Sequence, residues 1–396
     1  MFWLCFYWFI YGMEKRNIKA WVIKMSSPRR IYSIDVLRGL TISLMIIVNN
    51  PGSWASVYSP LLHAKWHGCT LTDLVFPFFL LIVGASTRFA FVKWHYYPSK
   101  EFHLHVFWRS LSIFLAGILL NAFPFIKQDW NWESFRFFGV LQRIAIAYGL
   151  SAILIIRYDF KIILKIITSI LLFYWAALYF FNPVSSYSVE TNLVRTIDIF
   201  LFGENHLYKG FGIAFDPEGL FSTIPAVATV LIGYLLGGML HTTKNFNDCA
   251  KRMSILGLVL IVTGYLWGFI LPINKPLWTS SYVLFTSGFG ALSLSFLTYL
   301  IDIKGFKKYF IPFEIFGTNS IFLFLLSGLW TKTIIAIKLD LDGNLVSSYY
   351  YLYKTVFYPI FGSYNGSLIF ALTHLLFFWI ILFWMHQKKI NLYDVN

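Results

Sequence analysis

The sequence predicts an all-α integral membrane protein, a polytopic helical bundle of about ten transmembrane helices. Apolar residues make up 58% of the 396-residue chain and charged residues only 13%, about half the usual share in a soluble domain. The mean hydropathy is +0.66. A water-soluble globule of this length could not bury so much apolar surface. The same composition excludes a disordered chain and a nucleic-acid-binding domain.

Ten apolar runs are long enough, or nearly long enough, to cross a bilayer as helices. The first is short, and the ninth is longer than one span needs, so we expect there a bent helix or a span followed by a surface segment. The runs are Val36–Asn50, Thr72–Val92, Val106–Ala122, Phe138–Ile156, Ile162–Phe181, Leu220–His241, Met253–Leu271, Tyr282–Ile301, Tyr309–Ile337 and Ser367–His386.

Basic residues alternate between the two sides of these spans. Of the 32 Lys and Arg residues, 21 lie on one side and 9 on the other, while Arg38 and Arg143 lie within or at the edge of spans. The positive-inside rule therefore predicts that both termini are cytoplasmic. An even number of spans fits this alternation, and the net charge of +14 is first of all a topology signal.

The domain organisation that we expect is an N-terminal leader over residues 1–28, a single transmembrane domain over residues 29–390 and a cytoplasmic tail over residues 391–396. The aromatic run Met1–Met13 is too short to span a bilayer. Our hypothesis is that Met25 is the natural start; the alternative is an interfacial anchor.

Three polar residues are expected to meet at the outer ends of the first two spans. Asn49 closes the first span, Asp73 opens the second, and His63 lies in the loop between them. A carboxylate beside an imidazole fixes its tautomer and raises its basicity, so the pair could act as a general base. Spacing alone favours a simpler role for Asp73, as an acidic residue in the first turn of a helix.

Gln142 and Arg143 lie several residues inside the fourth span. A charge at that depth is costly and usually faces a cavity or a partner. We therefore favour a functional role slightly over a structural ion pair, for which Asp73 is a candidate partner.

Further candidates for binding a substrate lie in the other two outer loops. Asp216, Pro217 and Glu218 have the order of a helix start, with Asp as N-cap and Pro at the first helical position. For Lys275 and Trp278 the simpler interpretation is a snorkelling lysine beside an interfacial tryptophan. The complete set is His206, Asp216, Glu218, Asn274, Lys275 and Trp278.

A charged cluster marks the inner edge of the first span. Its members are Arg29, Arg30, Asp35 and Arg38. These residues could anchor the helix to anionic lipid, or they could bind the phosphates of a cytoplasmic ligand. The three cysteines show no metal-ligand or redox spacing, and we expect no metal.

These segments together resemble a known family. The segment Arg30–Gly39 is similar to the opening motif of transmembrane acyltransferases. The segment His63–Pro77 is more specific. Together with Gly139–Arg143, His206–Tyr208, Asp216–Gly219 and Asn274–Trp278, it resembles heparan-α-glucosaminide N-acetyltransferases and their bacterial relatives, in the same order along the chain.

The resemblance implies an N-acetyltransferase that moves an acetyl group from cytoplasmic acetyl-CoA to the amino group of a glucosamine-type sugar on the outer side. It places His63 on the family's active-site histidine and puts Asn49 and Asp73 in the same pocket. Arg29, Arg30, Asp35 and Arg38 would face the donor. The family's acetyl group could pass through an acetylated histidine, or move directly to the acceptor in a ternary complex.

The expected partners are an amino-sugar or glycan acceptor and membrane lipid, with no nucleic acid, and a homodimer is one expected assembly. The bacterial relatives suggest the bacterial inner membrane as the location. Two other functions remain open. One is a transporter or flippase for a sugar or lipid-linked glycan, although no two-half repeat is visible. The other is an O-acyltransferase of envelope polysaccharide.

Overall fold

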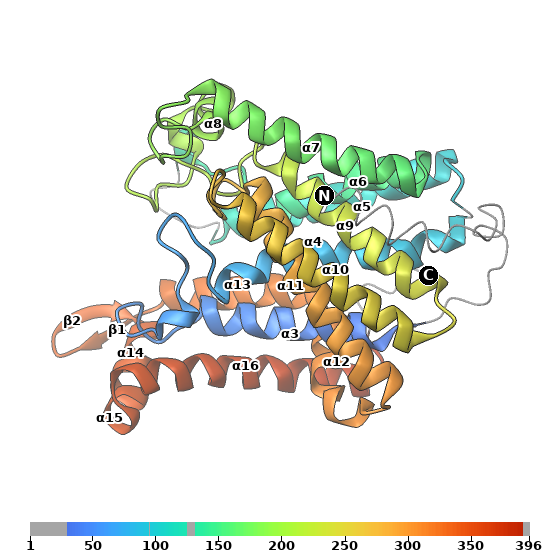
Figure 1. Cartoon of the computed structure of the whole chain (residues 1–396). Helices are drawn as coiled ribbons and strands as arrows, with labels where there is room; N and C mark the ends of the chain where they lie inside the picture. The colour runs from blue at the N-terminus through green and yellow to red at the C-terminus, as the bar shows by residue number, and fades with distance from the viewer. Residues whose placement is uncertain (1–29, 95, 125–130, 391–396) are drawn as a thin grey trace.

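The computed structural model describes residues 30–94, 96–124 and 131–390 of the chain (Figure 1). The expected leader, the expected tail and Arg29 lie outside the described residues. Nearly all of the secondary structure is helical.

In the described part of the chain, nine helices are long and apolar enough to cross a membrane. This confirms the predicted polytopic helical class, and each of the nine overlaps one of the expected spans. They are α3 (Tyr32–Asn49), α4 (Val75–Ala90, within the longer helical stretch Thr72–Trp94), α5 (Lys100–Ala122), α6 (Val140–Arg157), α7 (Phe160–Phe181), α9 (Thr223–Thr242), α10 (Phe246–Trp267), α11 (Ser280–Leu297, continued as a π-helix to Ile303) and α16 (Ser363–Gln387).

The ninth apolar run forms a bent pair, as expected for a run too long for one span. The stretch Lys307–Thr318, which contains α12 (Ile311–Thr318), meets α13 (Ser320–Ala336) at an angle of 71°. The helix breaks at Asn319, a residue type that competes with helical hydrogen bonding through its own side chain. Counting the pair as one span brings the total to as many as ten.

Shorter elements occupy the connections. The two-stranded antiparallel hairpin β1 (Lys338–Leu341) and β2 (Asn344–Ser347) pairs Lys338 with Ser347. The short helices are α8 (Leu193–Phe202), α14 (Ser348–Leu352), α15 (Tyr358–Phe361) and the 3₁₀ or π turns η1 (Ser59–Leu61), η2 (Thr72–Leu74), η3 (Phe91–Trp94), η4 (Trp132–Ser134), η5 (Glu204–His206), η6 (Thr298–Ile303), η7 (Lys307–Phe310) and η8 (Tyr353–Phe357).

Helix α9 forms the centre of the bundle, and 16 of its 20 residues are buried. Helices α7 and α16 run along opposite edges (Figure 1), and both leave many large apolar side chains exposed, as expected where helices face lipid. A second apolar cluster joins α3, α12, α13 and α16. The fold is therefore a buried helix surrounded by helices that have one face toward the membrane.

Glycines allow α4 and α9 to approach closely. A Cβ atom at Gly84 of α4 would overlap the carbonyl oxygen of Val230, and one at Gly233 of α9 would overlap the carbonyl oxygen of Leu81. In a membrane the lipid is as apolar as the helices, so helices associate through close packing and not through the hydrophobic effect. Small residues at the contact are the usual means of such close packing. This contact holds the middle of α4 against the central helix α9.

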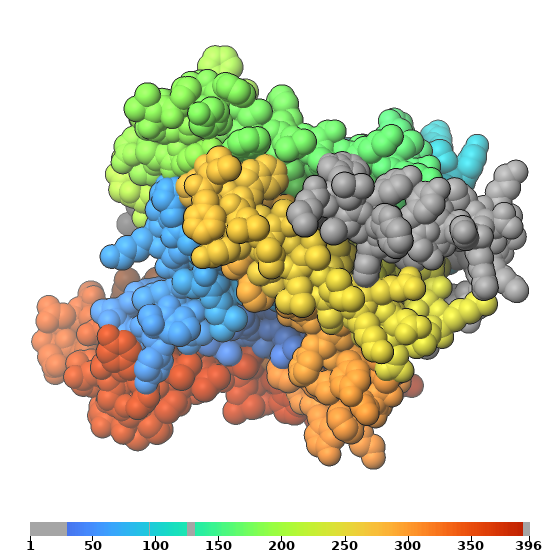
Figure 2. All heavy atoms as spheres, in the orientation of Figure 1, coloured from blue at the N-terminus to red at the C-terminus, as the bar shows by residue number. Residues whose placement is uncertain are grey.

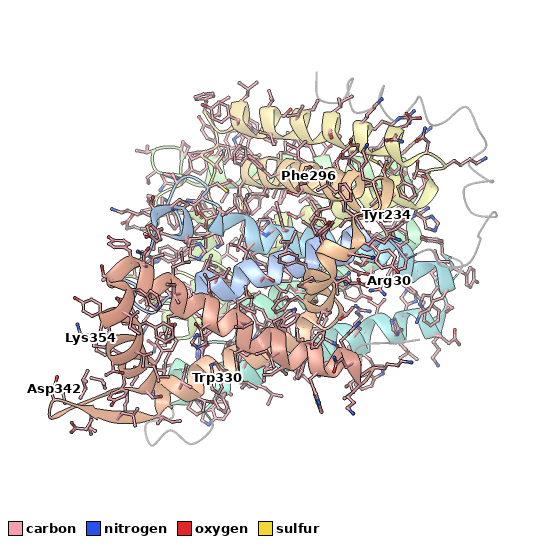
Figure 3. All side chains as sticks on the ribbon, turned by 90° about the horizontal axis from the view of Figure 1, so that it is seen from below. Arg30, Tyr234, Phe296, Trp330, Asp342 and Lys354 are labelled. Carbon is pink, nitrogen blue, oxygen red and sulfur yellow. The ribbon has the colours of Figure 1, made fainter. Side chains whose placement is uncertain are left out.

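Three connections gather at one end of the bundle, which we call the site end. They are residues 50–71, 182–222 and 268–279. The amide of Gly68 donates to the carbonyl of Ile273, and the indole Nε1 of Trp66 donates to the carbonyl of Tyr187 at 2.7 Å. Figure 2 shows the loop around residues 50–70 (blue) beside the connection 268–279 (gold). In Figure 3, Asp342 and Lys354 lie at one end of the molecule and Arg30 lies toward the other.

We predict that Gly84→Val destabilises the folded protein by about 1–3 kcal/mol, because the added methyl groups overpack the contact between α4 and α9. Thermal unfolding in detergent measures this as a lower midpoint. Ala90→Val is the control, since Ala90 is exposed at the end of the same helix. Equal midpoints for the two variants would contradict the close-packing argument.

Candidate active site

The structure brings His63 and Asp73 together. The imidazole Nδ1 of His63 lies 2.6 Å from Oδ1 of Asp73. The His63 side chain is 49% exposed, whereas that of Asp73 is 1% exposed. A buried carboxylate therefore holds one nitrogen of a ring whose remaining surface is open at the site end.

Asp73 is surrounded by donors. Its Oδ2 accepts hydrogen bonds from the amides of Ala64 and Thr70 and from the Thr70 hydroxyl, each at 3.0 Å. The hydroxyl of Tyr282 on α11 donates to the Asp73 carbonyl at 2.6 Å. A carboxylate with this set of donors is stabilised in its ionised form, so its Oδ1 accepts the Nδ1 proton of His63.

Asp73 lies in the 3₁₀ turn η2, which leads into α4. The simpler interpretation, that it only occupies a first helical turn, is therefore insufficient, because its carboxylate also orients His63 and closes the loop between them. The tautomer follows from these contacts. With Nδ1 protonated, Nε2 of neutral His63 is free to accept a proton.

Lys275 is the third member of this cluster. Its Nζ lies 3.1 Å from Nδ1 of His63 and 3.4 Å from Oδ1 of Asp73. Burial lowers the pKa of Lys275, and the nearby Asp73 carboxylate acts in the opposite direction. Burial also raises the pKa of the neighbouring Cys69 thiol to about 12, so that thiol is neutral.

The connection from 268 to 279 is an internal part of the site, and the interpretation of Lys275 and Trp278 as snorkelling and interfacial residues is wrong. Trp278 is 1% exposed, and its Nε1 donates to the Thr229 hydroxyl of α9. The buried side chain of Asn274 donates through Nδ2 to the Trp66 carbonyl at 2.9 Å. Its Oδ1 accepts a hydrogen bond from the backbone amide of Leu277. The loop is therefore locked in place, and it carries Lys275 to His63.

Arg143 is fully buried on α6. Its guanidinium lies over the Trp278 ring, 5.0 Å from the centroid, and its Nη2 donates to the Gly219 carbonyl and to the Ser222 hydroxyl. Among the described residues, the partners of the Arg143 guanidinium are therefore Trp278, Gly219 and Ser222, and not Asp73. The less favoured alternative, an ion pair of Arg143 with Asp73, is therefore not formed among the described residues.

The polar atoms of this interior are incompletely paired. Among the described residues, Nε and Nη1 of Arg143 and Nε2 of Gln142 have no hydrogen-bond partner. Gln142 lies against Gly117 and Gly139. Buried polar atoms of this kind usually bind water or a ligand.

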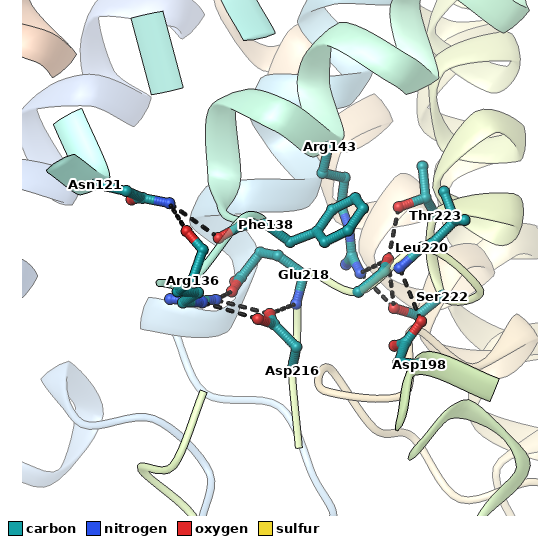
Figure 4. Close-up of polar contacts among 11 residues, drawn as sticks. Asn121, Arg136, Phe138, Arg143, Asp198, Asp216, Glu218, Leu220, Ser222 and Thr223 are labelled. Carbon is teal, nitrogen blue, oxygen red and sulfur yellow. Dashed lines mark hydrogen bonds and ion pairs between the residues drawn. The ribbon is translucent and has the colours of Figure 1, made fainter. Parts of the chain in front are cut away.

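Residues 216–219 form a turn, and the predicted helix start at Asp216 is wrong, since α9 begins only at Thr223. The guanidinium of Arg136 binds both carboxylate oxygens of Asp216, at 2.7 and 2.8 Å, and also Glu218 at 2.7 Å (Figure 4). The Asp216 side chain also accepts from the amide of Glu218. These contacts engage the Asp216 carboxylate in a loop, where it cannot cap a helix.

Sequence reasoning did not find Arg136 or Asp198. Asp198 of α8 is fully buried and accepts hydrogen bonds from the backbone amides of Leu220 (Figure 4) and Phe221. It thus holds from one side the same turn that Arg143 holds from the other. An acidic residue within the apolar stretch of α8 was the available signal, but its partner lies 22 residues away.

The structure does not bring every expected residue to His63. Nδ1 of His206 lies 2.7 Å from the carbonyl oxygen of Phe135, the residue before Arg136. Asn49 is exposed at the last position of α3, and its neighbour Asn50 is the buried one, bonded to Ile46 and Thr331. No described contact joins Asn49 to His63.

The charged cluster at the other end of α3 is largely self-contained. Asp35 binds Arg30 at 2.8 Å and Arg38 at 3.1 Å, and Arg30 also binds Glu314. Arg38 further donates to the Gly317 carbonyl and to the Ser86 hydroxyl. Arg30 is half exposed, so it retains more surface for an anionic ligand than Arg38 does. Among the described residues, no group of three His, Cys, Asp or Glu side chains could hold a metal ion.

Comparison with known proteins decides the family. The family described as heparan-alpha-glucosaminide N-acetyltransferase, catalytic, matches residues 30–267. The chain belongs to this family. The match includes His63 and Asp73 and ends before Lys275, and it confirms the resemblance that the motifs carry.

Two curated relatives extend the comparison. The human heparan-alpha-glucosaminide N-acetyltransferase is 29% identical over 356 residues, which cover 75% of this chain and 52% of the human protein. The mouse protein of the same name is 30% identical over 360 residues, covering 76% of this chain and 54% of the mouse protein. The chain thus spans about half the length of the curated relatives that it matches.

We predict that Asp198 makes stability depend on pH. Burial raises the pKa of Asp198 to about 7, above its ordinary value of about 4. The folded state therefore binds this proton more tightly than the unfolded chain does. The resulting stabilisation is complete below about pH 4 and is lost as the pH rises to about 7.

Thermal unfolding in detergent at about pH 5 and about pH 8 measures this dependence. The midpoint of the parent should fall more between the two pH values than that of Asp198→Asn, whose amide does not titrate. Identical falls in the two proteins would contradict the assignment.

Proposed function

We propose that this protein is a transmembrane N-acetyltransferase that transfers the acetyl group of acetyl-CoA to the amino group of a glucosamine-type sugar. The observation that carries the proposal is the His63–Asp73 contact, a base oriented by a buried carboxylate at an open end of a membrane bundle. Membership of the family supports acetyl transfer as the reaction class. The donor and the acceptor are our proposals.

The chemistry requires a base. An acceptor bound as an ammonium has no free electron pair, so a proton must leave before nitrogen can attack the thioester carbonyl. His63 Nε2 accepts that proton. The new bond joins the amine nitrogen to the acetyl carbon, and the bond between carbon and sulfur breaks. A second proton leaves the nitrogen for the sulfur, and His63 releases the first proton to water, so that the products are the amide, the free CoA thiol and one proton.

Two routes satisfy this balance. His63 can remove the proton within a complex of both substrates, or Nε2 can first take the acetyl group and pass it on. Incubation with donor alone separates them, because only the second route yields acetylated His63 together with free CoA.

The donor is proposed to enter from the end of the bundle opposite His63, which the basic residues predict to be cytoplasmic. Its phosphates need cations there, and the half-exposed Arg30 guanidinium can supply one. Arg38 is more fully engaged by protein groups, and Arg29 lies outside the described residues. Arg30 is thus the better-placed phosphate ligand of the two.

We predict that inside-out membrane vesicles containing the full chain convert acetyl-CoA and glucosamine into N-acetylglucosamine and free CoA. Vesicles without the protein are the control, and mass spectrometry follows both products. Release of CoA without acetylation of glucosamine would leave the reaction class intact but contradict this acceptor. Absence of any dependence on acetyl-CoA would contradict the enzyme and favour a transporter.

We predict that His63→Ala lowers the rate of acetyl transfer by about 10²–10⁴-fold, the usual contribution of a general base, while the protein stays folded. His386→Gln is the matched control, because His386 is exposed near the other end of the bundle. Unfolding midpoints in detergent confirm that both variants are folded. Full activity in His63→Ala would disprove the site assignment.

A further inference from the structure

The contacts of Lys275 distinguish it from an ordinary substrate-binding lysine. Its Nζ approaches the Nδ1 side of the His63 ring, at 3.1 Å, whereas the acceptor is proposed to meet Nε2. A lysine ammonium would also repel an amino sugar that arrives as an ammonium. Contact with the acceptor's amino group is therefore a poor explanation for the position of Lys275.

The donor and acceptor roles of the neighbouring groups show that Nδ1 of His63 carries a proton. Asp73 is buried and ionised, so its Oδ1 accepts the proton of Nδ1 at 2.6 Å. The ammonium of Lys275 has only donors and cannot bond to an Nδ1–H group. Its favourable contact is with Oδ1 of Asp73, at 3.4 Å, and its charge then lies beside the imidazole.

This arrangement opposes a second proton on His63. An isolated carboxylate beside an imidazole favours the imidazolium form. With Lys275 present, the imidazolium would lie 3.1 Å from another cation, and the negative charge of Asp73 is already balanced. A protonated His63 could neither accept a proton nor attack a thioester.

The other ionisable groups nearby do not replace this effect. Burial keeps the Cys69 thiol neutral by raising its pKa to about 12. Glu218 is paired with Arg136 at 2.7 Å. Among the described residues, Asp73 and Lys275 are therefore the two charged groups that face the imidazole directly.

We propose that Lys275 is a positioning residue whose positive charge neutralises Asp73 and keeps His63 unprotonated, so that the acid limb of the activity profile lies at lower pH. This inference rests on the proposed role of His63 as the reacting base. In this proposal Lys275 acts on His63 and does not contact the acceptor.

The test compares the parent with Lys275→Met, Lys275→Arg and Lys65→Met in the full chain in detergent. Lys65 is exposed and lies on the same loop as His63, so its variant removes an equal charge without touching the cluster. Diethyl pyrocarbonate acylates an imidazole ring only when the ring is unprotonated. Its rate of reaction at His63, followed by peptide mass spectrometry between about pH 5 and pH 8, reports the protonation midpoint without any acetyl transfer.

We expect the midpoint for His63 to lie at higher pH in Lys275→Met than in the parent, because an unbalanced carboxylate beside the ring favours the imidazolium form. Lys275→Arg should stay close to the parent because the charge is kept, and Lys65→Met should not move. The acid limb of kcat for acetyl transfer should shift with the same sign and ranking. If Lys275→Met does not fold, Lys275→Gln is compared in its place.

An unchanged or lower midpoint in the uncharged variant would overturn the inference. A shift of equal size in Lys65→Met would also overturn it, because it would show a general charge effect. If the parent does not acetylate an amino sugar, the proposed function fails, but the reaction of His63 with diethyl pyrocarbonate still decides the role of Lys275.

Discussion

The buried carboxylate of Asp73 is the contact on which the site depends. It closes the loop before α4 by accepting hydrogen bonds from the amides of Ala64 and Thr70. It also orients His63 and attracts Lys275, which lies on a connection about 200 residues later in the chain. A buried carboxylate is costly unless it is paired and hydrogen-bonded, so the surrounding chain must supply donors. Meeting that requirement brings the base, its orienting acid and a balancing cation into one place.

Close helix packing makes this arrangement rigid. Asp73 precedes α4, and α4 is held against the central helix α9 where Gly84 and Gly233 remove the side chains that would separate the two backbones. The indole of Trp278 bonds to Thr229 of the same central helix, which fixes the connection that carries Lys275. Both parts of the site are thus packed against α9. A change in the distance between these helices would move Lys275 away from His63.

Much of the fold could be predicted because the bilayer imposes a strong pattern on sequence. Spans must be long and apolar, and all ten expected runs overlap helices, including the bend near Asn319. Roles of single polar residues were harder to predict, because each has a sufficient local explanation. Asp216 has the sequence of a helix cap, yet Arg136 binds its carboxylate and the helix starts later. Lys275 and Trp278 have the composition of an interface, yet Trp278 is buried and the Lys275 side chain is only 18% exposed.

The sequence by itself determined the class of protein, the positions of its spans and, through its motifs, the family and the candidacy of His63. Those properties depend on local composition and on short motifs. Only the tertiary structure decided which polar groups face one another: Lys275 and Asp73 at His63, Arg136 at Asp216, and Asp198 at the turn before α9. The physical reason is that the energy of a charge depends on the distance to its partners and on burial. Both are set by contacts between helices and loops that are remote in the chain.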